Sequence, residues 1–327
     1  MAELDYVALH LTKVCSNKCP YCYIDAGKNK HPSFDKIKKI IDYLTKNRIK
    51  NILLVGGDPC SYPHLKDVVR QIIKHDIKVM ILSNTLEFGK DLDFFLDNIG
   101  DFEATVLGAD AKQHDSEAGR IGAYDKLIKN MKFLNEHGKK ITIVLSIHKN
   151  NYSNIYHIIE NLVEKEKIDI NEICFQRIIP IGRAANKDYS LEKNNTNKIF
   201  MQIALLDKKY HIPIEFEDPF PLCIIPKRYQ YMQKHPCEWG FSKASIYFDG
   251  SISRCGADNR SILGNIFKIE NLQKFWSENP LLIDFRSKKW LPKKCLECDM
   301  LERCRCGCPL SRSTDKEHEC DVLCNFC

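Results

Sequence analysis

The segment LTKVCSNKCPYCYID, residues 11–25, places three cysteines within eight positions, directly after a short apolar run. Cys15, Cys19 and Cys22 have the spacing C-x3-C-x2-C. A closed zinc site needs four protein ligands, and the next cysteine along the chain is Cys60. An iron–sulfur cluster held by three thiolates instead leaves one iron free to bind a substrate or cofactor. The spacing therefore favours such a cluster, with a zinc knuckle or a group of redox thiols as alternatives.

Strand-like and helix-like segments alternate around this motif over the first two thirds of the chain. Strands are predicted at 6–12, 51–55, 78–84, 102–108, 140–147 and 172–178. Helical spacing of apolar residues predicts helices from about 33, at 64–74, at 123–136 and around 156–165. Six βα units in succession require a parallel sheet, either closed as a partial barrel or left open. The predicted class is α/β, and the chemistry is expected on loops that follow the strands.

Two of these loops carry distinctive residues. The cysteine motif follows the first strand, and GGDP (Gly56 to Pro59) follows the second. Paired glycines are a weak signal alone, because many βα turns need glycine for backbone reasons. Their placement at the same edge of the predicted sheet as the cysteines favours a functional role for both loops.

The composition limits the class of protein. The chain has 327 residues, a formal net charge of +6 and 16 cysteines, and metal-bound thiolates would lower that charge. A nucleic-acid-binding surface is therefore not indicated. No cationic region precedes an apolar stretch at the start, and no uncharged apolar run approaches the roughly 18 residues of a membrane span. We expect a cytoplasmic protein without a membrane partner, whose cysteines are metal ligands or catalytic thiols.

The C-terminal third differs from the rest. Eight of the 16 cysteines lie in the last 33 residues, 295–327. Regular alternation stops after about residue 210, and SIYFDGSISRC at 245–255 predicts a β-hairpin with Asp249-Gly250 at its turn. A segment this poor in apolar periodicity needs a metal as a staple. We expect a core at 1–210, a bridging region at 211–236 and a small cysteine-rich domain at 237–327.

The N-terminal motif resembles that of the radical SAM enzymes, in which an aromatic residue such as Tyr21 precedes the last cysteine. GGDP is similar to the family's glycine-rich segment beside the amino group of S-adenosylmethionine. Ser83-Asn84 matches its Ser/Thr-Asn position near the cofactor. The resemblance implies a partial (β/α)6 barrel of the TIM type. It also implies a cofactor-binding set of Gly56, Gly57, Asp58, Pro59, Ser83 and Asn84.

Other parts of the core follow the same family, with one departure. The stretches at 114–134 and 176–184 resemble the segments after the family's fourth and sixth strands. Many relatives carry an aspartate after the fourth strand, where this chain has Gly108, with Asp110 two residues on. A substrate role of that aspartate is therefore not carried over to this chain.

The C-terminal cysteines resemble the SPASM extension of radical SAM peptide-modifying enzymes. The shared pattern is C-x(9–15)-G-x4-C, then C-x2-C-x5-C-x3-C, then a last cysteine. The motifs LGNI, FW and FR between the two halves fit the same resemblance. Alone, these cysteines would slightly favour a zinc module. Together with the N-terminal motif they favour two auxiliary iron–sulfur clusters in 237–327.

The resemblance implies a ligand set for each of three [4Fe-4S] clusters. The SAM-binding cluster is held by Cys15, Cys19 and Cys22. The first auxiliary cluster is held by Cys237, Cys255 and Cys308. The second is held by Cys295, Cys298, Cys304 and Cys324, with Cys320 and Cys327 as other choices for its last ligand.

The first auxiliary cluster lacks an obvious fourth ligand. Relatives often have a cysteine a few residues before the position of Cys237, whereas the nearest one here is Cys223. Cys223 is expected either to be that ligand or to be a free thiol that donates a hydrogen atom to a substrate radical. Cys60 and Cys174 are expected to be buried structural residues, and Cys306 has no predicted role.

The resemblance implies an oxidoreductase that reductively cleaves S-adenosylmethionine to a 5′-deoxyadenosyl radical. The radical would modify a ribosomally made peptide by forming a crosslink or thioether or by epimerising a residue. The implied partners are the peptide and an electron donor such as flavodoxin or ferredoxin. Since the chain starts almost at its first strand, the peptide is expected to dock on the core or through a separate leader-binding protein. The alternatives are a sulfatase-maturing or tetrapyrrole-modifying enzyme and a zinc-stapled, non-catalytic binding protein.

Overall fold

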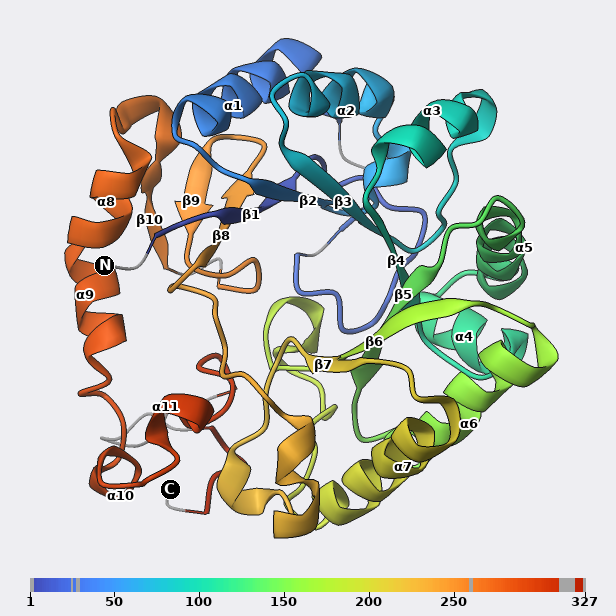
Figure 1. The fold of residues 1–327 in the computed structure, drawn as a ribbon, viewed down its shortest axis with the longest axis vertical. Helices are drawn as coiled ribbons and strands as arrows, with labels where there is room; N and C mark the ends of the chain where they lie inside the picture. The colour runs from blue at the N-terminus through green and yellow to red at the C-terminus, as the bar shows by residue number, and fades with distance from the viewer. Residues whose placement is uncertain (1–2, 25, 28–29, 259–260, 312–320, 326–327) are drawn as a thin grey trace.

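The computed structural model describes residues 3–24, 26–27, 30–258, 261–311 and 321–325. A single sheet of ten strands, in the order β10-β9-β8-β1-β2-β3-β4-β5-β6-β7, curves through the molecule with helices on its outer side (Figure 1). The strands are β1 (Tyr6–His10), β2 (Asn51–Val55), β3 (Lys78–Ser83), β4 (Asp101–Val106), β5 (Ile141–Ile147), β6 (Ile170–Arg177), β7 (Ile214–Phe216), β8 (Lys243–Tyr247), β9 (Ser251–Ser253) and β10 (Ile262–Asn265).

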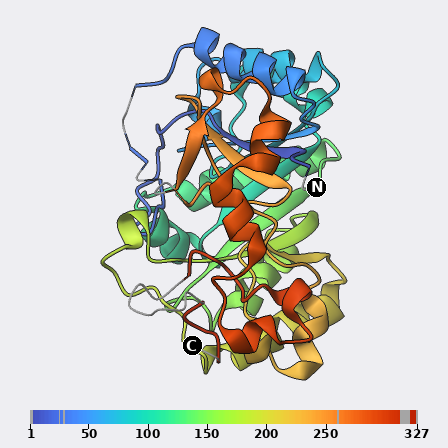
Figure 2. The ribbon, with the colours of Figure 1, turned by 90° about the vertical axis from the view of Figure 1, so that its left-hand side faces the viewer.

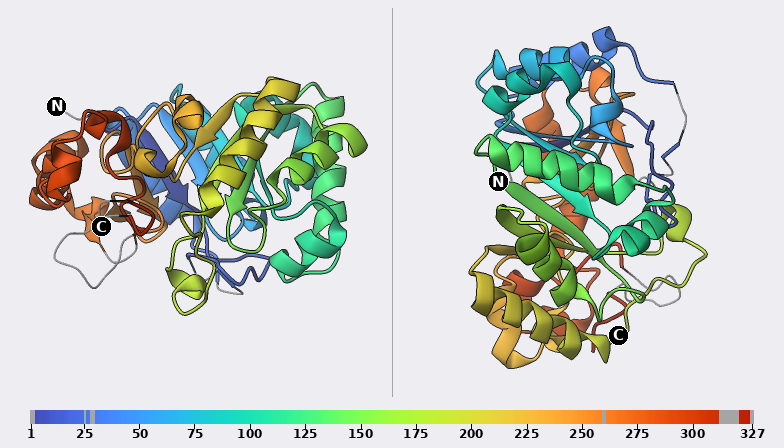
Figure 3. Two further views of the ribbon diagram at one scale, coloured as in Figure 1. Left: turned by 90° about the horizontal axis from the view of Figure 1, so that it is seen from below. Right: turned by 90° about the vertical axis from the view of Figure 1, so that its right-hand side faces the viewer.

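The helices form the outer layer and the C-terminal part. They are α1 (Phe34–Lys46), α2 (Leu65–Ile73), α3 (Leu92–Asn98), α4 (Ala111–Ala118), α5 (Ala123–Glu136), α6 (Ile155–Glu160), α7 (Asn195–Tyr210), α8 (Leu272–Glu278), α9 (Pro280–Ser287), α10 (Lys293–Leu296) and α11 (Leu301–Cys304). Helices α3 to α7 lie over the strands when the molecule is seen from its right-hand side (Figure 3). No helix among the described residues is long and apolar enough to cross a membrane.

Strand β1 shows how the sequence builds this curved sheet. It pairs in parallel with β2 on one side and with β8 on the other. Val7 and Leu9 are fully buried in the main apolar core. Tyr6, Ala8 and His10 alternate with them and line a cavity on the inner side. The strand therefore has an apolar outer face toward the helices and a more polar inner face.

The outer face is sealed by amphipathic helices. On α1, Ile37, Ile40, Ile41 and Leu44 recur at helical spacing, and all four are buried in the main core. Complete burial of such side chains is worth about 1.5–3 kcal/mol each. The same pattern on α5 buries Leu127, Ile128, Met131 and Leu134.

The C-terminal part is bonded to the rest of the molecule near both of its own ends. Helices α8 and α9 follow β10 along one side of the molecule, and the chain continues to α10 and α11 (Figure 2). The backbone N–H of Leu272 donates to Asn47 Oδ1 at 2.7 Å, next to α1. At the other end, the guanidinium of Arg177 on β6 forms a buried ion pair with Asp321.

The predicted α/β partial barrel is confirmed. All six expected strands are present, and each begins and ends within two residues of its predicted position. The expected hairpin is the β8–β9 pair, with Gly250 at its turn at a φ of +89°. The sequence did not predict α3, α4, α7 or the parallel strand β7, nor the parallel pairing of the hairpin strand β8 with β1. These strands make one sheet continuous across residues 210 and 236, so the division into three regions remains a proposal.

Candidate functional site

The inner face of the curved sheet borders a cavity of about 570 Å³. Cys15, Cys19 and Cys22 all line it from the loop after β1. Arg183 fixes this loop, because its guanidinium donates to Cys19 O at 3.3 Å and also to Ala26 O. The three cysteines predicted to share a cluster therefore lie together at the carboxyl end of the parallel strands.

The glycine-rich segment packs directly against the backbone that leads into the cysteine loop. The N–H of Gly57 donates to Thr12 O at 2.7 Å, and the N–H of Asp58 donates to Val14 O at 2.9 Å. A Cβ on Gly56 would lie 2.5 Å from Thr12 O, and one on Gly57 would lie 2.6 Å from the carbonyl carbon of Val14. Glycine is required here because two backbones approach more closely than any side chain allows.

Asp58, Pro59 and Ser83 lie behind the cavity wall rather than on it. Ser83 Oγ donates to Asp58 Oδ1 at 2.7 Å, and Thr85 Oγ1 donates to Asp58 Oδ2 at 2.9 Å. Burial raises the pKa of Asp58 above its ordinary value. Among the predicted cofactor-binding residues, Gly56, Gly57 and Asn84 line the cavity, and the other three support them.

Two asparagines beside the cysteines have unused hydrogen-bonding atoms. Asn84 Nδ2 donates to Cys15 Sγ at 3.2 Å, and Asn84 Oδ1 has no partner among the described residues. Asn17 is 2% exposed, and neither its Oδ1 nor its Nδ2 finds a partner there. Unpaired buried polar atoms cost about 1–3 kcal/mol each. These free donors and acceptors, beside glycines without side chains, fit the amino and carboxyl groups of S-adenosylmethionine.

The sequence analysis missed a polar pair farther along the inner face. His10 stacks on Tyr247 at 4.5 Å between ring centroids, and burial lowers the pKa of His10 to about 3. His10 Nε2 and Ser245 Oγ are buried without a partner in the described part of the chain, and both residues line the cavity. The sequence feature that could have indicated this pair is the histidine inside the apolar run YVALHLT.

An acidic wall also lines the cavity, and it was not predicted from the sequence. It is formed by Glu103, Glu172, Glu215 and Glu217, and Lys243 forms an ion pair with Glu217 at 3.6 Å. Burial and the negative charges of Asp101, Glu217 and Glu172 raise the pKa of Glu103 to about 8. The signal was the alternation of polar residues in DFEATV and INEICFQR, which places acids on the inner face of β4 and β6.

The three cysteines predicted for the first auxiliary cluster lie close together. Cys255 and Cys308 pack in one small cluster of side chains. Burial and the neighbouring Cys237 raise the pKa of Cys255 above its ordinary value. Asp218, just after β7, contacts Cys308, with Asp218 Oδ1 and Cys308 Sγ 3.6 Å apart. The sequence analysis did not identify Asp218, because a single aspartate after a short strand carries no spacing signal.

The second cysteine group contains two residues that were not predicted to belong to it. The thiols of Cys295, Cys306 and Cys324 all lie within 4.8 Å of one another. Cys223 Sγ is 3.8 Å from Cys324 Sγ, which places Cys223 beside this group. Cys304 Sγ accepts a hydrogen bond from Leu222 N at 3.2 Å, so Cys304 lies beside the segment that carries Cys223.

The remaining cysteines are placed as follows. Cys298 follows Cys295 in a turn, with its N–H donating to Cys295 O at 3.2 Å. Cys60 lies behind the glycine-rich segment, where its N–H donates to Asp58 Oδ1, and Cys174 lines the cavity from β6. Cys320 and Cys327 lie outside the described residues.

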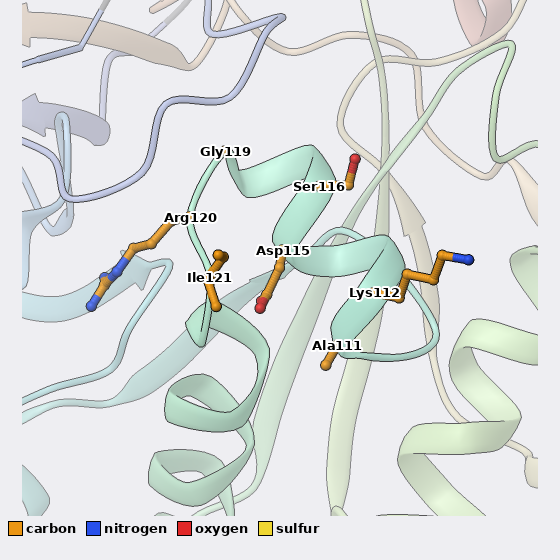
Figure 4. Close-up of a pocket in the computed structure, with 7 residues that line it drawn as sticks. All are labelled: Ala111, Lys112, Asp115, Ser116, Gly119, Arg120 and Ile121. Atoms are coloured by element: carbon orange, nitrogen blue, oxygen red, sulfur yellow. The ribbon is translucent and has the colours of Figure 1, made fainter.

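A second hollow, of about 540 Å³, lies on the outer surface at α4 and the turn before α5 (Figure 4). The carboxylate of Asp115 there accepts hydrogen bonds from the N–H groups of Gly122 and Tyr124. Arg120 Nη1 donates to Ser16 Oγ at 2.6 Å, which ties this turn to the cysteine loop. The turn that borders the hollow thus supports the cysteine loop from the outer side.

Family models match both halves of this arrangement. Residues 9–162 match the radical SAM superfamily. These residues therefore form a radical SAM domain. Residues 237–299 match the SPASM iron–sulfur cluster-binding domain. The chain thus combines a radical SAM domain with a SPASM domain, and S-adenosylmethionine and more than one iron–sulfur cluster are its cofactors.

Curated relatives of known name are distant and longer. The chain is 22% identical over 271 residues to the antilisterial bacteriocin subtilosin biosynthesis protein AlbA of Bacillus subtilis, covering 80% of this chain and 57% of AlbA. It is 27% identical to Fe-coproporphyrin III synthase of Methanosarcina barkeri, covering 58% of this chain and 48% of that protein. The chain thus spans about half the length of these two relatives.

Solved structures confirm the fold. SuiB of Streptococcus suis bound to its precursor peptide SuiA matches with a TM-score of 0.80 and 18% identity, over 99% of this chain and 76% of that one. The anSMEcpe protein with bound AdoMet and the Cp18Cys peptide matches with a TM-score of 0.75 and 15% identity, over 98% and 94%. At this identity the likeness is one of fold.

Proposed function

We propose that this chain modifies a ribosomally made peptide by hydrogen abstraction, using S-adenosylmethionine cleaved at the cluster of Cys15, Cys19 and Cys22. One observation carries the proposal. These three cysteines share the cavity with Asn84, which bonds to Cys15, and with a glycine-rich segment that presents backbone instead of side chains. Three thiolates leave one iron for the cofactor, which when bound and reduced supplies a carbon radical that abstracts hydrogen.

The residues of this chain have separate tasks in that reaction. The thiolates hold the cluster, and Asn17 and Asn84 offer their unpaired atoms to the amino-acid end of S-adenosylmethionine. Asp58 and Ser83 hold the glycine-rich segment from behind. The apolar outer faces of the strands and their helices keep water from the core, and the inner cavity gives a substrate side chain access to the site.

A peptide substrate is supported by the comparisons. AlbA is named for the biosynthesis of a bacteriocin, and SuiB is seen with a precursor peptide. The acidic wall with Glu103, Glu172 and Glu217 lines the same cavity as the three cysteines and would contact a substrate group that enters it. A reduced flavodoxin or ferredoxin would supply the electron, and the peptide would dock on the core or through a separate leader-binding protein.

We further propose that residues 237–327 hold two auxiliary clusters. Cys237, Cys255 and Cys308 would bind the first. The second would take its ligands from the group around Cys295 and Cys324, with Cys298 and Cys304 on the adjoining turns.

The test is turnover of S-adenosylmethionine without an added substrate, because many such cleavages run slowly uncoupled. Anaerobically reconstituted protein with dithionite is expected to release methionine and 5′-deoxyadenosine in equal amounts, and Cys22→Ala is expected to abolish both. Cys60→Ala, outside the three-cysteine motif, is the control and should retain release. Iron-loaded wild-type protein that forms no 5′-deoxyadenosine would contradict the proposal.

The substrate class has its own test. Short peptides encoded next to the gene are expected to stimulate 5′-deoxyadenosine formation and to change in mass. Iron-coproporphyrin is the competing substrate, because one relative is a synthase of that compound. Stimulation by the porphyrin, with no mass change in any peptide, would exclude the peptide assignment while leaving the radical chemistry intact.

A further inference from the structure

The first auxiliary site has three cysteines, and a closed four-iron cluster needs a fourth protein ligand. Cys223 lies 3.8 Å from Cys324, on the second group. Cys306 also belongs to that group. Cys174 on β6 faces the acidic wall, where Glu217 and Glu103 are its charged neighbours. None of these three cysteines is in contact with the first group within the described part of the chain.

Asp218 is placed where that ligand is needed. Its Oδ1 lies 3.6 Å from Cys308 Sγ. Its Oδ2 accepts a hydrogen bond from Arg177 N at 3.3 Å, and its backbone oxygen accepts one from Arg177 Nε at 3.2 Å. The carboxylate is therefore held from one side by β6, with the other oxygen directed at the cysteines. Asp218 also lines the same cavity as Cys255.

The carboxylate contacts Cys308, and its charge also acts on the other two cysteines of the group. Its negative charge is among the influences that raise the pKa of Cys237, Cys255 and Cys308. Arg177, which holds Asp218, is itself committed to Asp321 and to Pro219 O. The guanidinium thus bonds to the backbone oxygen of Asp218, while the carboxylate Oδ1 contacts the thiol of Cys308.

We propose that Asp218 is the fourth protein ligand of the first auxiliary cluster, binding through Oδ1, an inference that rests on the proposed function above. Carboxylate oxygen is an established iron ligand in proteins. The three thiols and the carboxyl group bind as anions, so loading the cluster releases their protons to solvent. Carboxylate oxygen donates less electron density to iron than thiolate sulfur does, so the cluster is expected to have a higher reduction potential than an all-cysteine cluster. Cys223 is then a residue of the second site.

The test uses the full chain with Cys15→Ala/Cys19→Ala/Cys22→Ala, so that only the auxiliary clusters contribute. Asp218→Ala, Asp218→Cys, Glu215→Gln and Cys223→Ala are made in this background and reconstituted anaerobically. Glu215→Gln is the matched control, because Glu215 is a cavity carboxylate three residues away. The readouts are iron per chain and a reduction titration followed by electron paramagnetic resonance.

The parent is expected to hold about eight irons and to give two auxiliary signals. Asp218→Ala should lose or shift one signal, and Asp218→Cys should restore it at a lower potential. Glu215→Gln should leave both signals unchanged, and Cys223→Ala should alter only the other one. Unchanged signals in Asp218→Ala, or the same signal altered by Cys223→Ala, would overturn the assignment. A parent that binds zinc and no iron would instead refute the proposed function.

Discussion

At the scale of single residues, the site depends on positions where a side chain is absent or unpaired. Gly56 and Gly57 let the segment after β2 touch the backbone of the cysteine loop. Asn17 and Asn84 keep polar atoms free beside the cysteines at a cost in stability. A folded chain retains such a cost where a ligand offsets it, which is why these atoms indicate the cofactor site.

Gly57→Ala is predicted to damage the site by overpacking. The new Cβ would lie 2.6 Å from the carbonyl carbon of Val14, so the loop must move. We expect a loss of about 1–3 kcal/mol in the free energy of unfolding and weaker binding of S-adenosylmethionine, measured by denaturant titration and equilibrium dialysis. Gly27→Ala is the control, because nothing lies within 4 Å of its Cβ. Equal behaviour of the two variants would show that the close approach does not matter.

The sequence predicted the residues of the site that belong to short motifs. The cysteine spacing, GGDP and Ser83-Asn84 were all recognisable, and the structure places Cys15, Gly57 and Asn84 on one cavity. Asn17, His10 and Asp218 were not predicted, because each acts through position in the fold rather than through spacing. Asp58 and Ser83 were predicted to belong to the cofactor-binding set, and the structure places them behind the cavity wall, bonded to each other.

At the scale of elements, the inner faces of β4 and β6 carry acids where a barrel strand commonly carries apolar residues. The alternation in DFEATV was visible in the sequence, but the sequence did not indicate which face points inward. In the structure, Phe102 and Ala104 are buried in the main core, so the acids face the cavity. Glu103 and Glu172 therefore line the cavity and do not form a solvent-exposed outer face.

Glu103→Gln is predicted to make stability less sensitive to pH. Burial, with neighbouring acids, raises the pKa of Glu103 to about 8 in the folded chain, against roughly 4.3 when unfolded. The folded state thus binds more protons, and wild-type stability falls as pH rises from about 4 to about 8, by up to about 1.4 kcal/mol per pH unit from this group. Unfolding of both proteins at pH 5 and pH 8 measures the difference. An equal difference in the free energy of unfolding between variant and wild type at pH 5 and at pH 8 would contradict this prediction.

Arg183→Ala is predicted to loosen the cysteine loop. Arg183 donates to Cys19 O and Ala26 O, while Lys187 donates to Pro20 O at 3.3 Å from an exposed position. We expect Arg183→Ala to lose most of the roughly four irons of this cluster after gel filtration and Lys187→Ala to keep them. If both variants retain the iron, the hydrogen bonds of Arg183 are not what holds the cysteine loop in place.

At the scale of the whole molecule, one sheet links the core to the cysteine-rich segment. The pattern of βα units and the family resemblance predicted the barrel, but the contribution of β7 and β8 was hidden. Ile214–Phe216 is only three residues long, and Lys243–Tyr247 was expected to belong only to a hairpin. Pairing of β8 with β1 is a long-range contact, and no local pattern in the sequence reports it.

The Arg177–Asp321 ion pair is predicted to hold the C-terminal segment to the barrel. Both side chains are buried, at 3% and 0% exposure. Asp321→Ala would leave a buried charge unpaired, which costs about 3–5 kcal/mol in the free energy of unfolding. Asp188→Ala breaks the exposed pair with Lys149 and should cost at most about 1 kcal/mol. Comparable losses in the two variants, measured by denaturant unfolding, would contradict this role.

The central claim is that the loop after β1 holds an iron–sulfur cluster for S-adenosylmethionine. The most direct measurement is the iron, sulfide and zinc content of anaerobically reconstituted protein, wild type beside Cys15→Ala/Cys19→Ala/Cys22→Ala. The account predicts about twelve irons per chain falling to about eight, with sulfide in step. Zinc without iron in both proteins would contradict it and make residues 11–25 a structural zinc knuckle.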